Sequence, residues 1–155
     1  MSVLSNQQVT DRTASHAAVV RDTVRRDELG PFYDRAFTQV LEVLSAQGHD
    51  PSGAAFGHYL GVPGETVTLE VGFEIPDPCT ASGDVIPVEL PAGKVAVASY
   101  FGAYDGLSQA WPEFAQWIVT QGQEPSENML ELYVTEPTGE SDPSTLQTDL
   151  VWYLA

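Results

Sequence analysis

Residues 37–63, "FTQVLEVLSAQGHDPSGAAFGHYLGVP", and residues 111–137, "WPEFAQWIVTQGQEPSENMLELYVTEP", align without a gap at an offset of 74 positions. Identical residues recur in the two stretches: Gln47, Gly48, Pro51, Tyr59 and Pro63 fall on Gln121, Gly122, Pro125, Tyr133 and Pro137. Further out, residues 11–29 align with 89–107 and residues 69–75 with 148–154. A period of this length indicates an internal duplication. We therefore divide the chain into two copies of one unit, residues 7–76 and 85–155, joined by a linker at 76–84.

The second copy is the clearer one for assigning elements. Residues 94–101 alternate and are rich in β-branched side chains, which predicts a strand, and residues 107–122 carry apolar side chains at helical spacing before Gly122. Residues 129–135 and 147–154 predict two further strands, with a loop at 136–145. Each copy is therefore a β-α-β-β unit. The whole is predicted to be an α+β fold with six strands in antiparallel sheets, two helices, a pseudo-twofold axis and a cleft between the halves.

The composition limits the class of protein. With 155 residues and 43% hydrophobic content, the chain is expected to form one compact domain over residues 1–155. No apolar run approaches the roughly 18 residues of a membrane span, and no signal-peptide core is present, so we expect a soluble, cytoplasmic protein. Cys79 is the single cysteine and no zinc-type spacing occurs, so we expect neither a disulfide nor a metal, and no cofactor.

The net charge of −16 is unevenly distributed along the chain. Residues 37–155 hold 17 acidic residues and one base, Lys94. Such a surface repels phosphate backbones, which argues against direct binding of DNA or RNA. We interpret the charge mainly as a solubility feature or an adaptation to a salty cytosol. The alternative is that it attracts small cations.

Acidic residues alternate with apolar ones in the last strand of each copy. The repeat makes Glu70 and Asp149 equivalent, and period-two alternation places Val151 and Tyr153 on the Asp149 face. Such a face is either open to water or the lining of a pocket for a flat cation. Val151 and Tyr153, the neighbours of Asp149 on this face, favour the interpretation as a pocket lining. In residues 129–135, Glu131 and Tyr133 share a face.

These segments together resemble a known family. "LEVGFEI", "VELPAGKVAVASYFGAYDGLSQAW", "ELYVTEP" and "DPSTLQTDLVWYLA" are similar to the GyrI-like, or AraC-type effector-binding, small-molecule-binding domains. The resemblance implies a tandem β-α-β-β module with a pocket between its halves, and a cation-binding acid on the terminal strand, at Asp149. The chain departs from the family pattern where Asp149 replaces the usual Glu, Ala103 a proline, Tyr100 a histidine and Tyr153 a proline.

The leading hypothesis for function is a stand-alone module that senses or sequesters a hydrophobic, aromatic, cationic small molecule. The repeat uses nearly all of the chain, so a role in transcription would require a partner protein. The oligomeric state and the natural ligand stay open. The expected ligand-binding residues are Asp149, Glu131, Tyr133, Glu70, Tyr104, Tyr59, Tyr153 and Trp111.

Two other functions remain. Some GyrI-like relatives resemble hydrolases that open strained rings of alkylating natural products, and in such a site Glu131 or Asp149 would activate water while Tyr104 or Tyr133 polarises the leaving group. The sequence does not distinguish a carboxylate that holds a cation from one that activates water. A third hypothesis is an inhibitor that docks on a DNA-processing enzyme such as a topoisomerase, with its acidic surface imitating nucleic acid.

Overall fold

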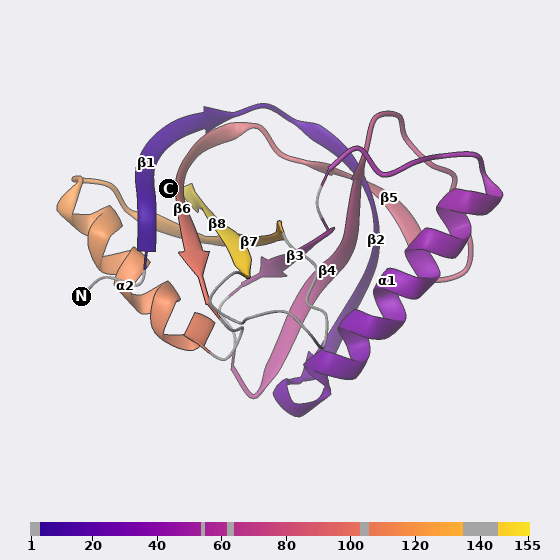
Figure 1. Ribbon diagram of the computed structural model, residues 1–155, viewed down its shortest axis with the longest axis horizontal. Coiled ribbons are helices and arrows are strands. Elements are labelled where there is room, and N and C mark those ends of the chain that lie inside the picture. The colour runs from indigo at the N-terminus through magenta and orange to yellow at the C-terminus, as the bar shows by residue number, and fades with distance from the viewer. Residues whose placement is uncertain (1–3, 54, 62–63, 103–105, 135–145) are drawn as a thin grey trace. The chain divides into compact units, whose positions relative to one another are not determined.

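The computed structural model describes residues 4–53, 55–61, 64–102, 106–134 and 146–155. The chain divides into two compact units, one made of residues 13–92 and the other of residues 1–12 and 93–155. We call them the first-copy unit and the second-copy unit, after the repeat that supplies most of each. Figure 1 shows their helices and strands.

The first-copy unit is a four-stranded antiparallel sheet with one helix. The strand order is β3-β4-β2-β5. Its elements are β2 (Ser15–Arg25), η1 (Arg26–Glu28), α1 (Leu29–Ala46), β3 (Ala55–Leu60), β4 (Thr66–Ile75) and β5 (Val85–Leu90). Figure 1 shows α1 lying along the sheet, and α1 contacts β2 and β4.

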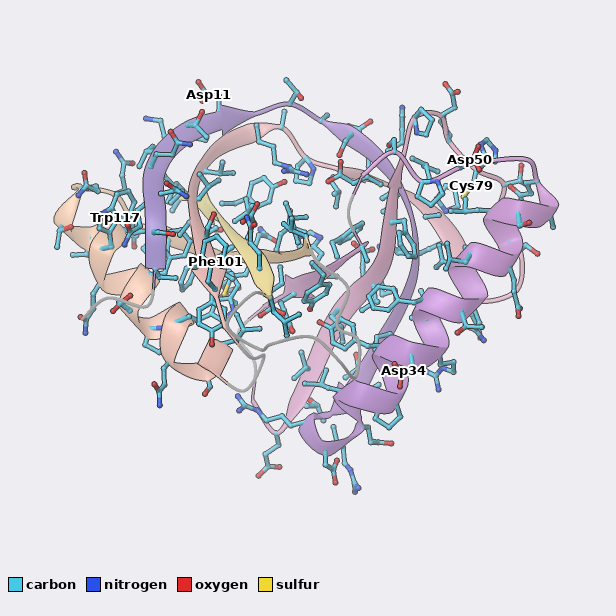
Figure 2. All side chains as sticks on the ribbon, viewed as in Figure 1. Asp11, Asp34, Asp50, Cys79, Phe101 and Trp117 are labelled. Carbon is cyan, nitrogen blue, oxygen red and sulfur yellow. The ribbon has the colours of Figure 1, made fainter. Side chains whose placement is uncertain are left out.

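One face of this sheet packs against α1. The helix buries side chains spaced by four residues: Phe32, Ala36, Val40 and Leu44. They meet the predicted apolar face of β4, whose buried members are Val67, Leu69, Val71 and Ile75. Cys79 is 6% exposed and joins the same core (Figure 2). The residues that the sequence places on the apolar face of β4 are therefore core residues.

The second-copy unit repeats this plan. Its strand order is β1-β6-β8-β7, all antiparallel. Its elements are β1 (Leu4–Arg12), β6 (Gly93–Phe101), α2 (Leu107–Thr120), β7 (Pro125–Tyr133) and β8 (Gln147–Leu154). Helix α2 buries Leu107, Ala110, Phe114 and Ile118 against Ala96, Ala98 and Leu150 of the sheet. The predicted α+β fold with a duplicated β-α-β-β core is confirmed.

The predicted number of strands was too low. The described residues form eight strands, and the two that alternation did not reveal are β1 and β5. Both are outer strands, and each pairs with the leading strand of the other copy: β1 pairs with β6 and β5 pairs with β2. An outer strand needs a weaker apolar pattern than a central one. Pro87 is tolerated within β5 because one edge of an outer strand needs no backbone donors for a neighbouring strand.

The repeat also predicted where the helices end. Gly48 and Gly122, identical in the alignment, both adopt φ of 73° just beyond α1 and α2. Glycine adopts this left-handed conformation at no steric cost, and this explains why both helices stop at the same place in the repeat.

Candidate functional site

A buried carboxylate lies between α2 and the sheet of the second-copy unit. Glu131, on β7, is 5% exposed. Its Oε2 accepts a hydrogen bond of 2.7 Å from the indole Nε1 of Trp111, on α2, and its Oε1 accepts one of 2.7 Å from the hydroxyl of Tyr133. Burial of a charged group is costly unless hydrogen bonds compensate. Two aromatic donors therefore hold this carboxylate in place.

Trp111, which donates to Glu131, packs against two further aromatic rings. The rings of Trp111 and Trp152 meet edge to face with centroids 5.2 Å apart, and Phe114 lies within 6.2 Å of both. The indole Nε1 of Trp152 donates to the carbonyl oxygen of Ser126 at 2.6 Å, which fixes that ring. The indole that donates to Glu131 is therefore part of a packed aromatic cluster.

Asp149 lies on the other face of this sheet. In the register of β7 with β8, Asp149 is opposite Leu132, whereas Glu131 is opposite Leu150, a core residue under α2. Residues that are directly opposite in a sheet point to the same side. The register therefore places Asp149 on the face opposite to that of Glu131 and Tyr133. Alternation separates the two faces of each strand but does not match faces between strands.

The surroundings of Asp149 are polar and well ordered. Its Oδ1 accepts 2.9 Å hydrogen bonds from the hydroxyl of Ser99 and from Nε2 of Gln147. Asp149 is half-buried, and Tyr153, on the same face of β8, is 7% exposed. Whether these two residues bind a ligand stays a prediction.

The first-copy unit neutralises its equivalent acid internally. Glu70 is 4% exposed, and its Oε2 accepts hydrogen bonds from Nε of Arg21 at 2.9 Å and from Nη2 at 2.5 Å. Nδ1 of His58 lies 3.4 Å from Oε1. Burial raises the pKa of Glu70, but the hydrogen bonds and charges of His58 and Arg21 outweigh burial, so the pKa lies below its ordinary value. Glu70 is thus an ion-pair partner of Arg21.

Tyr59 and Tyr104 are the remaining residues that the sequence predicted to bind a ligand. Tyr59 is half-buried on the α1 side of β3, where its hydroxyl lies 2.8 Å from that of Tyr33. Tyr104 lies outside the described residues. The sequence interpretation did not name Tyr33, which falls between the two aligned blocks, or Ser99, which aligns with Arg21.

The described residues give no sign of a metal site or a membrane helix. No group of three or more His, Cys, Asp or Glu side chains among them could hold a metal ion. None of their helices is both long enough and apolar enough to span a bilayer.

A family model matches most of the chain. The model of the GyrI-like small molecule binding domain matches residues 8–154. The chain belongs to the GyrI-like family. The match covers nearly all of both units, so it includes Glu131, Trp111 and Tyr133 as well as Tyr33 and Tyr59. No curated protein matches the chain.

Solved structures share the GyrI-like fold at low sequence identity. The EcmrR chain in an EcmrR–DNA complex has a TM-score of 0.86 at 17% identity over 99% of this chain, which spans 58% of that longer chain. The isolated EcmrR C-terminal domain has a TM-score of 0.81 at 17% identity, and the match covers 99% of this chain and 98% of that domain. SAV2435 bound to tetraphenylphosphonium gives 0.68 at 15% identity, with 97% and 94% covered. A hydrolase from Listeria innocua gives 0.69 at 13% identity, with 96% and 91% covered.

Proposed function

We propose that this GyrI-like chain binds a lipophilic aromatic cation at Glu131. The observation that carries the proposal is the buried carboxylate held between the indole of Trp111 and the phenol of Tyr133. Both of these donors are neutral, so neither of them repels a cation that approaches the carboxylate. A carboxylate favours a cation beside it over a neutral group of the same shape.

The energies are large enough to give useful affinity. A cation about 4 Å from a carboxylate gains on the order of 4 kcal/mol at an effective dielectric constant near 20. Each aromatic ring that faces the cation adds roughly 0.5 to 2 kcal/mol. Micromolar affinity requires only about −8 kcal/mol in total. The net charge of −16 favours the approach of a cation.

The structural comparison supports a ligand of this type. SAV2435, whose fold this chain shares, was solved with tetraphenylphosphonium, a bulky aromatic cation. Tetraphenylphosphonium has no hydrogen-bond donors, so a site for it relies on charge and ring contacts, and Glu131 and the rings of Trp111 and Trp152 offer these. As a sensor, the chain would pass the signal to a partner protein, because the acidic surface disfavours direct contact with DNA.

The test compares the wild type with Glu131→Gln by isothermal titration calorimetry with tetraphenylphosphonium. Glu131→Gln keeps the size of the side chain and removes the charge, so the Kd should rise about 10- to 100-fold. Asp149→Asn removes an equivalent charge from the opposite face and is the matched control. Equal losses in both variants, or no loss in Glu131→Gln, would refute the proposal.

Hydrolysis is the second candidate. The phenol of Tyr133 donates to Glu131 at 2.7 Å, and a hydrogen-bonded carboxylate of this kind can take a proton from water as the water oxygen attacks a strained ring carbon. The ring bond breaks, and the proton returns to the departing atom. Incubation with an activated-cyclopropane compound and mass spectrometry would decide the matter: a product heavier by one water, formed by the wild type and lost in Glu131→Gln, would establish the reaction.

A further inference from the structure

A buried hydroxyl lies in the second-copy sheet as the diagonal neighbour of Glu131. Thr148, on β8, is 0% exposed, and its Oγ1 has no hydrogen-bond partner among the residues that the structure describes. In the register, Thr148 is directly opposite Tyr133 of β7 on one side and Tyr100 of β6 on the other. Directly opposite residues point to the same side of a sheet, so Thr148 shares the α2 face with Tyr133 and Glu131.

The phenols on either side of Thr148 are directed elsewhere. The hydroxyl of Tyr133 donates to Oε1 of Glu131 at 2.7 Å. The hydroxyl of Tyr100 lies at the place that a Cβ atom on Gly106 would occupy, at the start of α2. Neither phenol bonds to Oγ1 of Thr148. A buried hydroxyl without a partner destabilises the folded state, because it has given up its hydrogen bonds to water.

The fold does not require a hydroxyl at this place. The repeat equivalent of Thr148 is Leu69, which is also 0% exposed and belongs to the α1 core. An aliphatic side chain therefore fills the same position in the first-copy unit. Buried polar groups without a partner are rare in folded proteins, and a functional role is one explanation for them. The position of Thr148 beside Glu131 suggests which role.

We infer that Thr148 makes the Glu131 site favour cations that carry N–H groups, such as protonated aromatic amines. The inference rests on the proposed function of Glu131. A primary ammonium group has three donors and no acceptor. It can donate one hydrogen bond to the carboxylate of Glu131 and another to Oγ1 of Thr148.

The separation of the two residues fits one bound nitrogen. Diagonal neighbours in an antiparallel pair are roughly 7 to 8 Å apart at their Cα atoms. Two N–H···O bonds of about 2.9 Å each join oxygen atoms up to about 5.5 Å apart. A quaternary cation has no N–H group, so it gains from the charge of Glu131 but not from the hydroxyl of Thr148.

The experiment titrates the full chain by calorimetry with 1-naphthylmethylammonium and with its N,N,N-trimethyl derivative, which keeps the ring and the charge. Thr148→Val keeps the branched shape and removes the hydroxyl. The Kd for the primary ammonium should therefore rise about 3- to 10-fold, whereas the Kd for the trimethyl derivative should stay within about twofold. Thr148→Ser keeps the hydroxyl and should keep the wild-type ratio of the two Kd values.

Thermal unfolding without ligand separates this role from a structural one. Since Oγ1 has no partner in the described part of the chain, Thr148→Val should unfold at a higher temperature than the wild type. A lower unfolding temperature would overturn the inference, because the hydroxyl would then stabilise the fold. If valine prevents folding, Thr148→Ala provides the same comparison of the two cations.

The binding data can overturn the inference independently. Equal changes in Kd for the two cations, no change for the primary ammonium, or no binding of the primary ammonium to the wild type would each do so. Glu131→Gln, titrated in parallel, should weaken both cations. If Glu131→Gln weakens neither, the proposed function fails. If it weakens both while Thr148→Val does not discriminate between them, only the role of Thr148 fails.

Discussion

Glu131 and Asp149 lie on the paired strands β7 and β8, and their side chains leave that sheet on opposite faces. Asp149 is opposite Leu132 in the register, and Glu131 is opposite Leu150 beneath α2. Ser99 and Gln147 donate hydrogen bonds to Asp149, whereas Trp111 and Tyr133 donate hydrogen bonds to Glu131. Two carboxylates of one unit are thus in separate environments, and each can be removed without altering the contacts of the other.

Asp149→Asn is expected to leave the binding of tetraphenylphosphonium unchanged within about twofold, because the charge removed lies across the sheet from Glu131. The variant should also fold, since β8 keeps its core residues Leu150 and Trp152. Isothermal titration calorimetry measures the first expectation and circular dichroism the second. A loss of tenfold or more in affinity would mean that Asp149 contacts the cation.

Trp111→Phe should destabilise the protein by about 1 to 3 kcal/mol, because it deprives the buried Glu131 of its 2.7 Å hydrogen bond. Urea denaturation followed by circular dichroism gives the free energy of unfolding. Trp117→Phe, on the same helix (Figure 2), is the control, since Trp117 stacks on Phe114 without a part in that hydrogen bond. Equal losses in the two variants would show that ring volume, and not the hydrogen bond, is responsible.

Stability should fall in acid partly through Glu70. Its pKa is lowered in the folded state, so its contribution is present above the pKa of the unfolded chain, near 4.5, and is lost as the pH falls through the lower folded value. The Glu70→Gln variant should therefore lose less stability than the wild type as the pH falls from neutral to below the unfolded pKa. If the free energy of unfolding falls with pH equally in the two proteins, this prediction is wrong.

Arg21→Met tests the same ion pair from the other side. The substitution leaves Glu70, which is 4% exposed, without its guanidinium partner. The free energy of unfolding should fall by about 3 kcal/mol. This is near the low end for buried ion pairs, because Arg21 is half exposed. Adding Glu70→Gln should restore much of the loss, since no uncompensated charge then remains. If the double variant is no more stable than Arg21→Met, the methylene packing of Arg21 is what matters.

The first-copy unit should accept a transplanted cation site. Gly57→Glu places a carboxylate at the repeat equivalent of Glu131, and Tyr33→Leu removes the phenol that would overlap it. Calorimetry should then show the number of tetraphenylphosphonium molecules bound per chain rising from one to two, with micromolar affinity (roughly −8 kcal/mol). Gly57→Glu alone should instead destabilise the protein by about 2 kcal/mol, because its Cβ would overlap the Tyr33 hydroxyl. Unchanged stoichiometry in a folded double variant would refute the equivalence of the two places.

The duplication, the helices and their ends, and the apolar faces could be predicted from the sequence, because each depends on local spacing. Phe32, Ala36, Val40 and Leu44 recur at helical intervals, and Gly48 supplies a left-handed residue wherever α1 stops. Both follow from chain geometry alone. The outer strands β1 and β5 escaped prediction because an outer strand needs only a weak apolar pattern, which alternation does not reveal.

The candidate site depended on tertiary structure. Alternation correctly put Glu131 with Tyr133 and Asp149 with Tyr153, but only the register between β7 and β8 decides that the first pair lies under α2 and the second on the opposite face. A one-residue shift in register would exchange the faces without altering any local pattern. The contact between Tyr33, on α1, and Gly57, the repeat equivalent of Glu131, likewise depends on tertiary structure, because spacing along the chain does not bring these two segments together.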